Sequence, residues 1–200
     1  ISTECVQNPM EYLYYGTDMI HIKDIMKRFS TISMKSYPFS SIFRHKIYLR
    51  YIKNLKVIKP LNYIKFVKKD AIQTLKYEYD WKPYPQKHFE SRFTAFYEGY
   101  WLPERFGFDT RRVQFSSLIL TGQMERAEAI ESLKKPAYDV EKIENEFKYI
   151  AKKLDISADE LKHYFQMEKK FYWDYKNQSK IFDLGAKVLK YFGAVKSIKR

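Results

Sequence analysis

The stretch from Trp81 to Gln123 constrains the fold more than any other, because it combines dense aromatic residues with turn signals. At about 100° per residue, the aromatic side chains between positions 89 and 100 fall on one narrow stripe, which we expect to be buried. The stripe consists of Phe89, Phe93, Phe96, Tyr97 and Tyr100. The pattern therefore predicts a helix over residues 85–101, and Pro103 is expected to stop it.

A second helix is predicted shortly after the first. Gly107 allows a tight turn, and Asp109 is a suitable N-cap residue for a helix over residues 110–120. Two helices joined by a short turn would bring several charged residues into one neighbourhood. These are Lys87, His88, Glu90, Arg105, Arg111 and Arg112.

The first predicted helix also has a polar face opposite the aromatic stripe. Lys87, Ser91, Thr94 and Glu98 fall within roughly 60° of one another in the same projection. Most faces of this kind are simply solvated, so the pattern alone indicates no binding site.

The rest of the chain predicts a mainly α protein with one or two short extended segments. Alternating apolar and basic residues indicate an extended piece at 55–59, and 62–69 is a second candidate. Apolar spacing and capping residues predict further helices at 20–29, 40–54, 68–79, 124–135, 140–154, 157–166 and 182–192.

Positive charge is concentrated in one segment. The chain carries a formal net charge of +13, and residues 25–69 contain twelve Lys or Arg and no Asp or Glu. Such a run can bind nucleic acid, anionic lipid, an acidic partner or a phosphorylated ligand, or it can reflect an AT-rich coding bias. In the predicted helix at 40–54 the basic residues are spread around the axis, so we expect no membrane contact there.

Other features exclude several classes of protein. No apolar run approaches the roughly 20 residues of a membrane span, and no signal peptide is present, so we expect a soluble, cytoplasmic protein. Cys5 is the only cysteine, which argues against a disulfide framework. His21, His45 and His163 lack ligand spacing, and no metal site is predicted.

Several motifs occur in order between residues 87 and 139. They are Lys87-His88-x-Glu90-Ser91-x-Phe93-Thr94, Tyr100-x-Leu102-Pro103-x-x-Phe106-Gly107-x-Asp109-x-Arg111, Ser116-x-Leu118-Ile119, Gly122-Gln123, Arg126-x-Glu128-Ala129 and Lys135-Pro136-x-Tyr138-Asp139. In these motifs, and more weakly over residues 20–174, the chain resembles the N-acetyl sugar amidotransferases of bacterial lipopolysaccharide, surface-polysaccharide and flagellar-sugar biosynthesis.

The resemblance implies ATP-dependent chemistry of the PP-loop ATP pyrophosphatase type, with ATP and Mg²⁺ as cofactors. ATP would activate the oxygen of an acetamido group on a nucleotide-linked N-acetyl sugar as an adenylate. Ammonia would then displace AMP and leave an acetamidino group. The resemblance also implies a partner pair, a glutaminase and a cyclase-like protein, that supplies the ammonia.

The chain departs from that family in one important respect. Family members carry a Ser-Gly-Gly-x-Asp-Ser phosphate loop and N-terminal cysteine pairs, whereas none of the six glycines here are adjacent. Ile1-Ser2-Thr3 resembles the end of a late strand of the PP-loop domain. We therefore expect the C-terminal part of the enzyme, inactive alone. Residues 1–65 would end the α/β PP-loop domain and form a basic connection, and 66–200 would form a helical C-terminal domain.

The resemblance also suggests roles for residues in and beside the first two motifs. Lys87, Arg111 and Arg112 would neutralise phosphate, and Arg105 would either bind the substrate or form a local salt bridge. His88 and Glu90 would transfer protons or bind sugar hydroxyls, and Ser91 and Thr94 would hydrogen-bond the ligand. For Asp109, helix capping remains the preferred role.

Two other functions remain open. One is a basic helical module that binds nucleic acid, although no reading motif supports it and we expect no such partner. The other is a non-catalytic module that docks a protein, such as the ammonia-supplying pair, through its basic segment.

Overall fold

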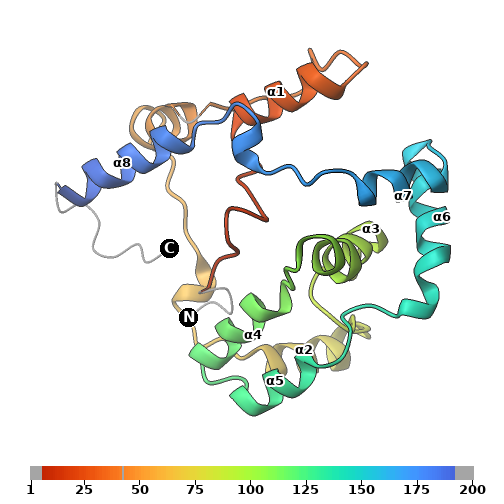
Figure 1. Cartoon of the computed structure of the whole chain (residues 1–200). Helices are drawn as coiled ribbons and strands as arrows, with labels where there is room; N and C mark the ends of the chain where they lie inside the picture. The colour runs from red at the N-terminus through yellow and green to blue at the C-terminus, as the bar shows by residue number, and fades with distance from the viewer. Residues whose placement is uncertain (1–5, 42, 192–200) are drawn as a thin grey trace. The chain divides into compact units, whose positions relative to one another are not determined.

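The computed structural model describes residues 6–41 and 43–191, which are mainly helical and contain no strand (Figure 1). The fold class predicted from the sequence is thus confirmed. Cys5 and the segment expected to end the PP-loop domain at residues 1–3 lie outside the described residues. None of the described helices is long and apolar enough to cross a bilayer.

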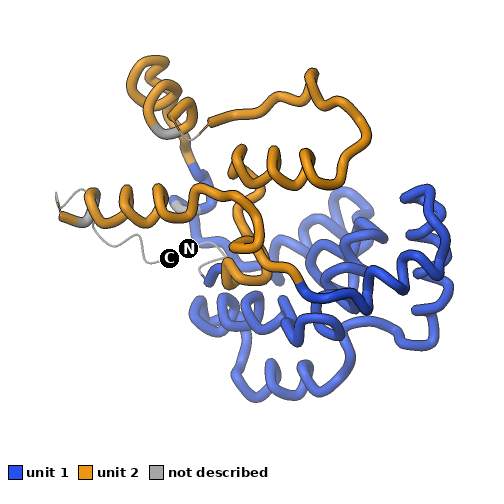
Figure 2. Tube along the Cα trace, turned by 45° about the horizontal axis from the view of Figure 1, so that its top comes forward, with its two compact units in different colours: residues 1–8, 59–169 blue, residues 9–58, 170–200 orange. Residues whose placement is uncertain are grey.

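The chain forms two compact units, each built from two stretches of sequence (Figure 2). Unit 1 comprises Ile1–Asn8 and Lys59–Lys169, and unit 2 comprises Pro9–Ile58 and Lys170–Arg200. The division at residues 65 and 66 concerns the domains of a longer enzyme, and it stays a prediction.

Unit 1 contains most of the helices. They are η2 (Pro60–Asn62, 3₁₀), α2 (Lys68–Tyr79), α3 (Arg92–Phe96), η3 (Tyr97–Phe106, π), α4 (Arg111–Leu120), α5 (Arg126–Leu133), η4 (Val140–Lys142, 3₁₀), α6 (Ile143–Leu154) and α7 (Ala158–Gln166). Unit 2 contains α1 (Met19–Phe29), η1 (Arg44–Ile52, π), η5 (Tyr172–Asp174, 3₁₀) and α8 (Ser179–Tyr191).

The core of unit 1 is an aromatic cluster between η3 and the α6–α7 pair. Phe96 is 2% exposed and meets Phe147 edge to face, with ring centroids 5.2 Å apart. Ile150, Ala151 and Leu161 complete the buried cluster, and aromatic rings of η3 and α7 pack against it. Edge-to-face pairs add to the stabilisation from burial itself.

An ion pair also connects α3 to α6. Arg92 donates two hydrogen bonds of 2.8 Å to the carboxylate of Glu146, and its guanidinium stacks 3.6 Å from the centre of the Tyr149 ring. The paired donors of arginine match the two oxygens of a carboxylate, which fixes the orientation of the two helices.

The prediction of a helix over residues 85–101 is wrong at both ends. His88 has a φ of 69°, a left-handed conformation that an α-helix cannot contain. The helix begins only at Arg92, where the Ser91 side chain caps it by accepting from the N–H of Thr94 at 3.3 Å. Phe93, which was expected to be buried, is 50% exposed.

The helix also continues past Pro103 instead of stopping there. From Tyr97 it widens into the π-helix η3, whose turns leave room for the proline ring that would clash with a carbonyl in an α-helix. It ends at Gly107, where a φ of 70° confirms the predicted turn.

Most other predicted helices are confirmed within a few residues. α2 spans residues 68–79 as predicted, and Asp139 and Ser157 accept the backbone N–H groups of Glu141 and Glu160 at the starts of η4 and α7. The helix predicted at 40–54 is present as the π-helix η1. Residues 55–59 form no strand.

In unit 2, side chains of α1 bind the backbone of the segment 174–178. Asp18 accepts the N–H of Gln178 at 2.6 Å, Asp24 accepts that of Lys176 at 2.9 Å, and Arg28 donates to the carbonyl of Asp174 at 3.1 Å. The Lys176 N–H holds the pKa of Asp24 below its usual value. These side chains thus satisfy backbone groups that no helix or strand of the described chain satisfies.

Replacing a core isoleucine tests the packing of unit 1. Ile150 is 1% exposed, so Ile150→Ala should lower the free energy of unfolding by about 2–5 kcal/mol, because it leaves a cavity beside Phe147. Ile130, which is 49% exposed on α5, provides a matched control whose change to alanine should cost less than about 1 kcal/mol. Urea denaturation followed by circular dichroism measures both, and equal costs would contradict this core.

Candidate functional site

Glu98 is a partly buried carboxyl group on the first turn of η3. It accepts a hydrogen bond of 3.3 Å from the hydroxyl of Thr110, a residue that is 2% exposed just before α4. Burial raises the pKa of Glu98 above its ordinary value of 4.5, and the Thr110 hydroxyl partly offsets that effect. A carboxyl group with a raised pKa is suited to accept and release protons nearer neutral pH.

The turn at residues 87–90 brings further charged groups to Glu98. His88 and Lys87 act electrostatically to lower the pKa of Glu98 and Glu90 acts to raise it, although burial outweighs all three. The Nδ1 atom of His88 lies 3.8 Å from Oε1 of Glu90. We refer to Lys87, His88, Glu90, Glu98 and Thr110 together as the Glu98 cluster.

The approach of this turn to η3 depends on Gly99. A Cβ atom at Gly99 would lie 2.9 Å from Cζ of Phe89, closer than real Cβ contacts, and 3.0 Å from Cδ2 of Tyr138, tighter than most of them. The missing side chain therefore lets Phe89, in the middle of the turn, pack against the helix next to Glu98. π-Helical segments are frequent at functional sites, which fits this position.

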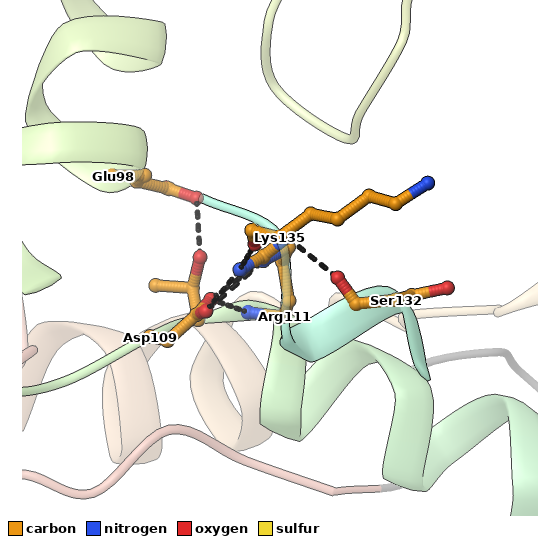
Figure 3. A network of polar contacts seen from close by, with 6 residues as sticks. Glu98, Asp109, Arg111, Ser132 and Lys135 are labelled. Atoms are coloured by element: carbon orange, nitrogen blue, oxygen red, sulfur yellow. Dashed lines mark hydrogen bonds and ion pairs between the residues drawn. The ribbon is translucent and has the colours of Figure 1, made fainter. Parts of the chain in front are cut away.

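Arg111 lies beside the cluster but is engaged in structural contacts (Figure 3). Its guanidinium pairs with both carboxylate oxygens of Asp109, at 2.7 Å for the closest contact, and donates to the carbonyls of Ser132 and Lys135. The Lys135 side chain itself points away from this network. Arg111 thus connects the start of α4 to the end of α5, and phosphate binding by this residue, which stays a prediction, would compete with these contacts.

Arg105 caps the C-terminus of α7. Its guanidinium donates to the carbonyl oxygens of Phe165, Met167 at 2.8 Å and Glu168 at 3.2 Å. Carbonyl groups at a helix C-terminus lack partners within the helix, and a cation also interacts favourably with the helix dipole. Substrate binding and a local salt bridge were the two roles considered for Arg105. The structure shows local contacts, but they are hydrogen bonds to carbonyl groups and not a salt bridge to a carboxylate.

The remaining predicted residues differ in their surroundings. Ser91 caps α3, and Thr94 is half-buried in the same helix. Arg112 has an exposed side chain on α4. The structure therefore brings together Lys87, His88 and Glu90 of the predicted set, and the ligand-binding roles of all eight residues stay predictions.

Two members of the cluster were missed as site residues by the sequence analysis. Glu98 was recognised only as part of a polar face, and Thr110 only as the start of a helix. The available signal was a carboxylate within a run of aromatic residues, where desolvation shifts its pKa.

The described residues contain no group of three or more His, Cys, Asp or Glu side chains arranged to hold a metal ion. The Glu98 cluster has two carboxylates, but Lys87 and His88 lie close enough to act electrostatically on Glu98. Its composition suits binding of a polar or charged organic ligand, and proton transfer to it, better than it suits coordination of Mg²⁺.

Comparison with known families shows to which family the chain belongs. The family described as "LPS biosynthesis protein WbpG-like, C-terminal domain" matches residues 90–189. The chain belongs to this family. The match begins at Glu90, includes Glu98, Thr110 and Arg111, and ends within α8. It confirms the resemblance to the C-terminal part of a lipopolysaccharide biosynthesis protein, while no curated protein and no solved structure matches.

Adjacent arginines separate a structural role from a surface one. Arg111→Met would leave the carboxylate of Asp109 without its buried partner, so we expect a loss of about 3–5 kcal/mol in the free energy of unfolding. Arg112→Met, at the exposed neighbouring position, should change it by less than about 0.5 kcal/mol. Urea denaturation of both variants is the measurement. An Arg111→Met variant as stable as Arg112→Met would show that the contacts of Arg111 between α4 and α5 do not stabilise the fold.

The raised pKa of Glu98 predicts a pH-dependent effect of removing its charge. Because the folded-state pKa lies above the ordinary value of 4.5, the carboxylate destabilises the folded protein as pH rises through that value. Glu98→Gln should therefore be more stable relative to wild type at pH 7 than at pH 4. Glu104→Gln, at an exposed position of η3, is the control for the loss of one carboxylate. Thermal unfolding at both pH values tests this, and an unchanged difference would refute the raised pKa.

Proposed function

We propose that the chain is the C-terminal part of an ATP-dependent amidotransferase that acts on a nucleotide-linked N-acetyl sugar. It would convert an acetamido group to an acetamidino group, in the biosynthesis of O-antigen or another surface polysaccharide, or of a flagellar sugar. The ammonia would come from a partner glutaminase and cyclase-like pair, and the reaction would take place in the cytoplasm. Membership of a lipopolysaccharide biosynthesis family supports the biological setting.

The observation that carries the proposal is the Glu98 cluster itself. Its turn residues Lys87, His88 and Glu90 belong to the first motif that resembles the amidotransferases. They come together with a carboxyl group whose pKa is raised by burial. The partial burial of Glu98, the left-handed conformation of His88 and the close approach of Phe89 to Gly99 support a site over a solvated polar face.

The charges suggest a division of labour within the site. Lys87 in the cluster and Arg112 on the surface of α4 are proposed to bind phosphate groups of the substrate. When ammonia adds to the activated carbon, its nitrogen must lose a proton, and Glu98, Glu90 or His88 is proposed to accept it. Ser91 and Thr94, at the start of α3, are proposed to contact the sugar.

ATP and Mg²⁺ are proposed to bind mainly outside this chain. No two of its six glycines are adjacent, so it has no glycine-rich loop whose backbone N–H groups could hold phosphate. The described residues likewise offer no set of metal ligands. On this proposal, the chain alone is inactive, and in the full-length enzyme it supplies residues that bind the sugar substrate.

Substitutions in the full-length enzyme test the proposed site. Lys87→Ala and Glu90→Ala should each lower kcat/KM by about 10²-fold, because they remove a phosphate contact and a proton-transfer or sugar contact. Lys134→Ala is a matched control, since Lys134 is an exposed residue whose ion pair with Glu131 lies at the surface, and it should retain full activity. The assay follows AMP and acetamidino sugar formation with ammonium chloride as the ammonia source.

Two outcomes would contradict different parts of the proposal. Unchanged turnover in both variants would remove Lys87 and Glu90 from the site while leaving the reaction in place. Absence of any ATP- and ammonia-dependent turnover in the wild-type enzyme would instead favour the non-catalytic docking module.

A further inference from the structure

The segment of unit 2 from Phe43 to Ile58 exposes an unusual amount of apolar surface. Seven of its sixteen residues are large hydrophobic side chains with exposed fractions between 45% and 77%. They are Phe43, Ile47, Tyr51, Ile52, Leu55, Val57 and Ile58. Scattered exposed hydrophobic residues are ordinary, but a dense group of them indicates an interaction site.

The π geometry of η1 gathers part of this surface onto one face. With hydrogen bonds to the fifth residue back, a π-helix has roughly 4.4 residues per turn, which places Phe43, Ile47, Tyr51 and Ile52 within about 80°. In an α-helix the same four side chains would span about half the circumference. The basic residues, which α periodicity spreads around the axis, now flank this face, with Arg44 and Lys53 on one edge and Arg50 on the other.

This face forms a convex ridge and not a groove. None of the closely packed helix pairs within the described part of the chain includes η1. The four side chains of the face are between 45% and 71% exposed, so the face is open to solvent. As the outer surface of a single helix it is convex, and it is suited to a flat surface more than to a protruding ligand.

The charge of the sequence that forms and precedes this face has a single sign. Residues 25–58 contain eight Lys or Arg and no Asp or Glu. A helix with exposed apolar residues on one face and basic residues beside them lies in the interface of an anionic membrane, where the cations contact headgroups and the apolar side chains enter the acyl region.

We propose that residues 43–58 bind the surface of an anionic phospholipid bilayer, with Phe43, Ile47, Tyr51 and Ile52 inserted below the headgroups. This reverses the expectation of no membrane contact, which assumed α-helical spacing. The inference rests on unit 2 alone and is independent of the proposed amidotransferase activity.

Other occupants explain the surface less well. A second copy of the same face would bring two basic segments together, and like charges repel. Nucleic acid would use the cations and the aromatic rings, but it would leave the aliphatic residues Ile47, Leu55 and Ile58 exposed to water. An acidic protein is the principal rival and is distinguished by the experiment below.

Vesicle co-sedimentation of the 200-residue chain tests the proposal. We expect binding to phosphatidylcholine vesicles that contain about one-third phosphatidylglycerol, little binding to phosphatidylcholine alone, and a decrease with salt. The double variant Ile47→Ser/Ile52→Ser should bind about tenfold more weakly or worse, because it removes two side chains of the apolar face. Arg44→Gln/Arg50→Gln should lose the preference for phosphatidylglycerol.

Leu120→Ser is the matched control for lost apolar surface. Leu120 is 71% exposed at the end of α4 in unit 1, compared with 63% for Ile52 in unit 2, and its replacement should leave vesicle binding unchanged. All substituted side chains are exposed, so each variant should fold, which circular dichroism checks.

Several results would overturn the proposal. Wild-type protein that does not sediment with anionic vesicles at low salt, or an Ile47→Ser/Ile52→Ser variant that sediments equally, would exclude membrane binding by this face. Concentration-dependent oligomers that the double variant abolishes, without vesicle binding, would assign the face to self-association. A full-length enzyme that fails to bind vesicles, when the 200-residue chain does, would show that another part of the polypeptide covers the face.

Discussion

Burial of Phe96 among the aromatic rings of η3, α6 and α7 is the interaction on which unit 1 depends. Phe96 meets Phe147 edge to face and packs against Tyr100 and Trp101 of its own helix. The contacts hold η3 in place, and η3 carries Glu98 and Gly99. The polar site is therefore a consequence of the aromatic core, since the same helix buries one face and presents a carboxyl group on another.

Three arginines of unit 1 have structural contacts. Arg92 pairs with Glu146, Arg105 caps α7, and Arg111 connects the ends of two helices. A guanidinium group can satisfy several carbonyl or carboxylate oxygens at once, so arginines are effective where helix ends meet. A high content of basic residues consequently says little about ligand binding until the contacts of each residue are known.

The two π-helical segments explain the main differences between sequence and structure. In η3 the wider turn accommodates Pro103, so the helix extends to Phe106 and ends at the Gly107 turn. In η1 it rearranges which side chains share a face, and basic residues that α periodicity scatters come to flank an apolar ridge. Both effects follow from the extra residue in each turn, which a 100° projection cannot represent.

The sequence by itself determined the helical class, most helix positions and the family, because apolar periodicity, capping residues and ordered motifs are local properties of the chain. It also placed Lys87, His88 and Glu90 in one neighbourhood. Only the tertiary structure decided where the first helix between Trp81 and Gln123 begins. The left-handed conformation of His88, which excludes an earlier start, accompanies the packing of Phe89 against Gly99. The tertiary structure alone assigned Arg105 and Arg111 to structural contacts and added Glu98 and Thr110 to the site, since desolvation and hydrogen bonds between distant residues arise only once the chain is folded.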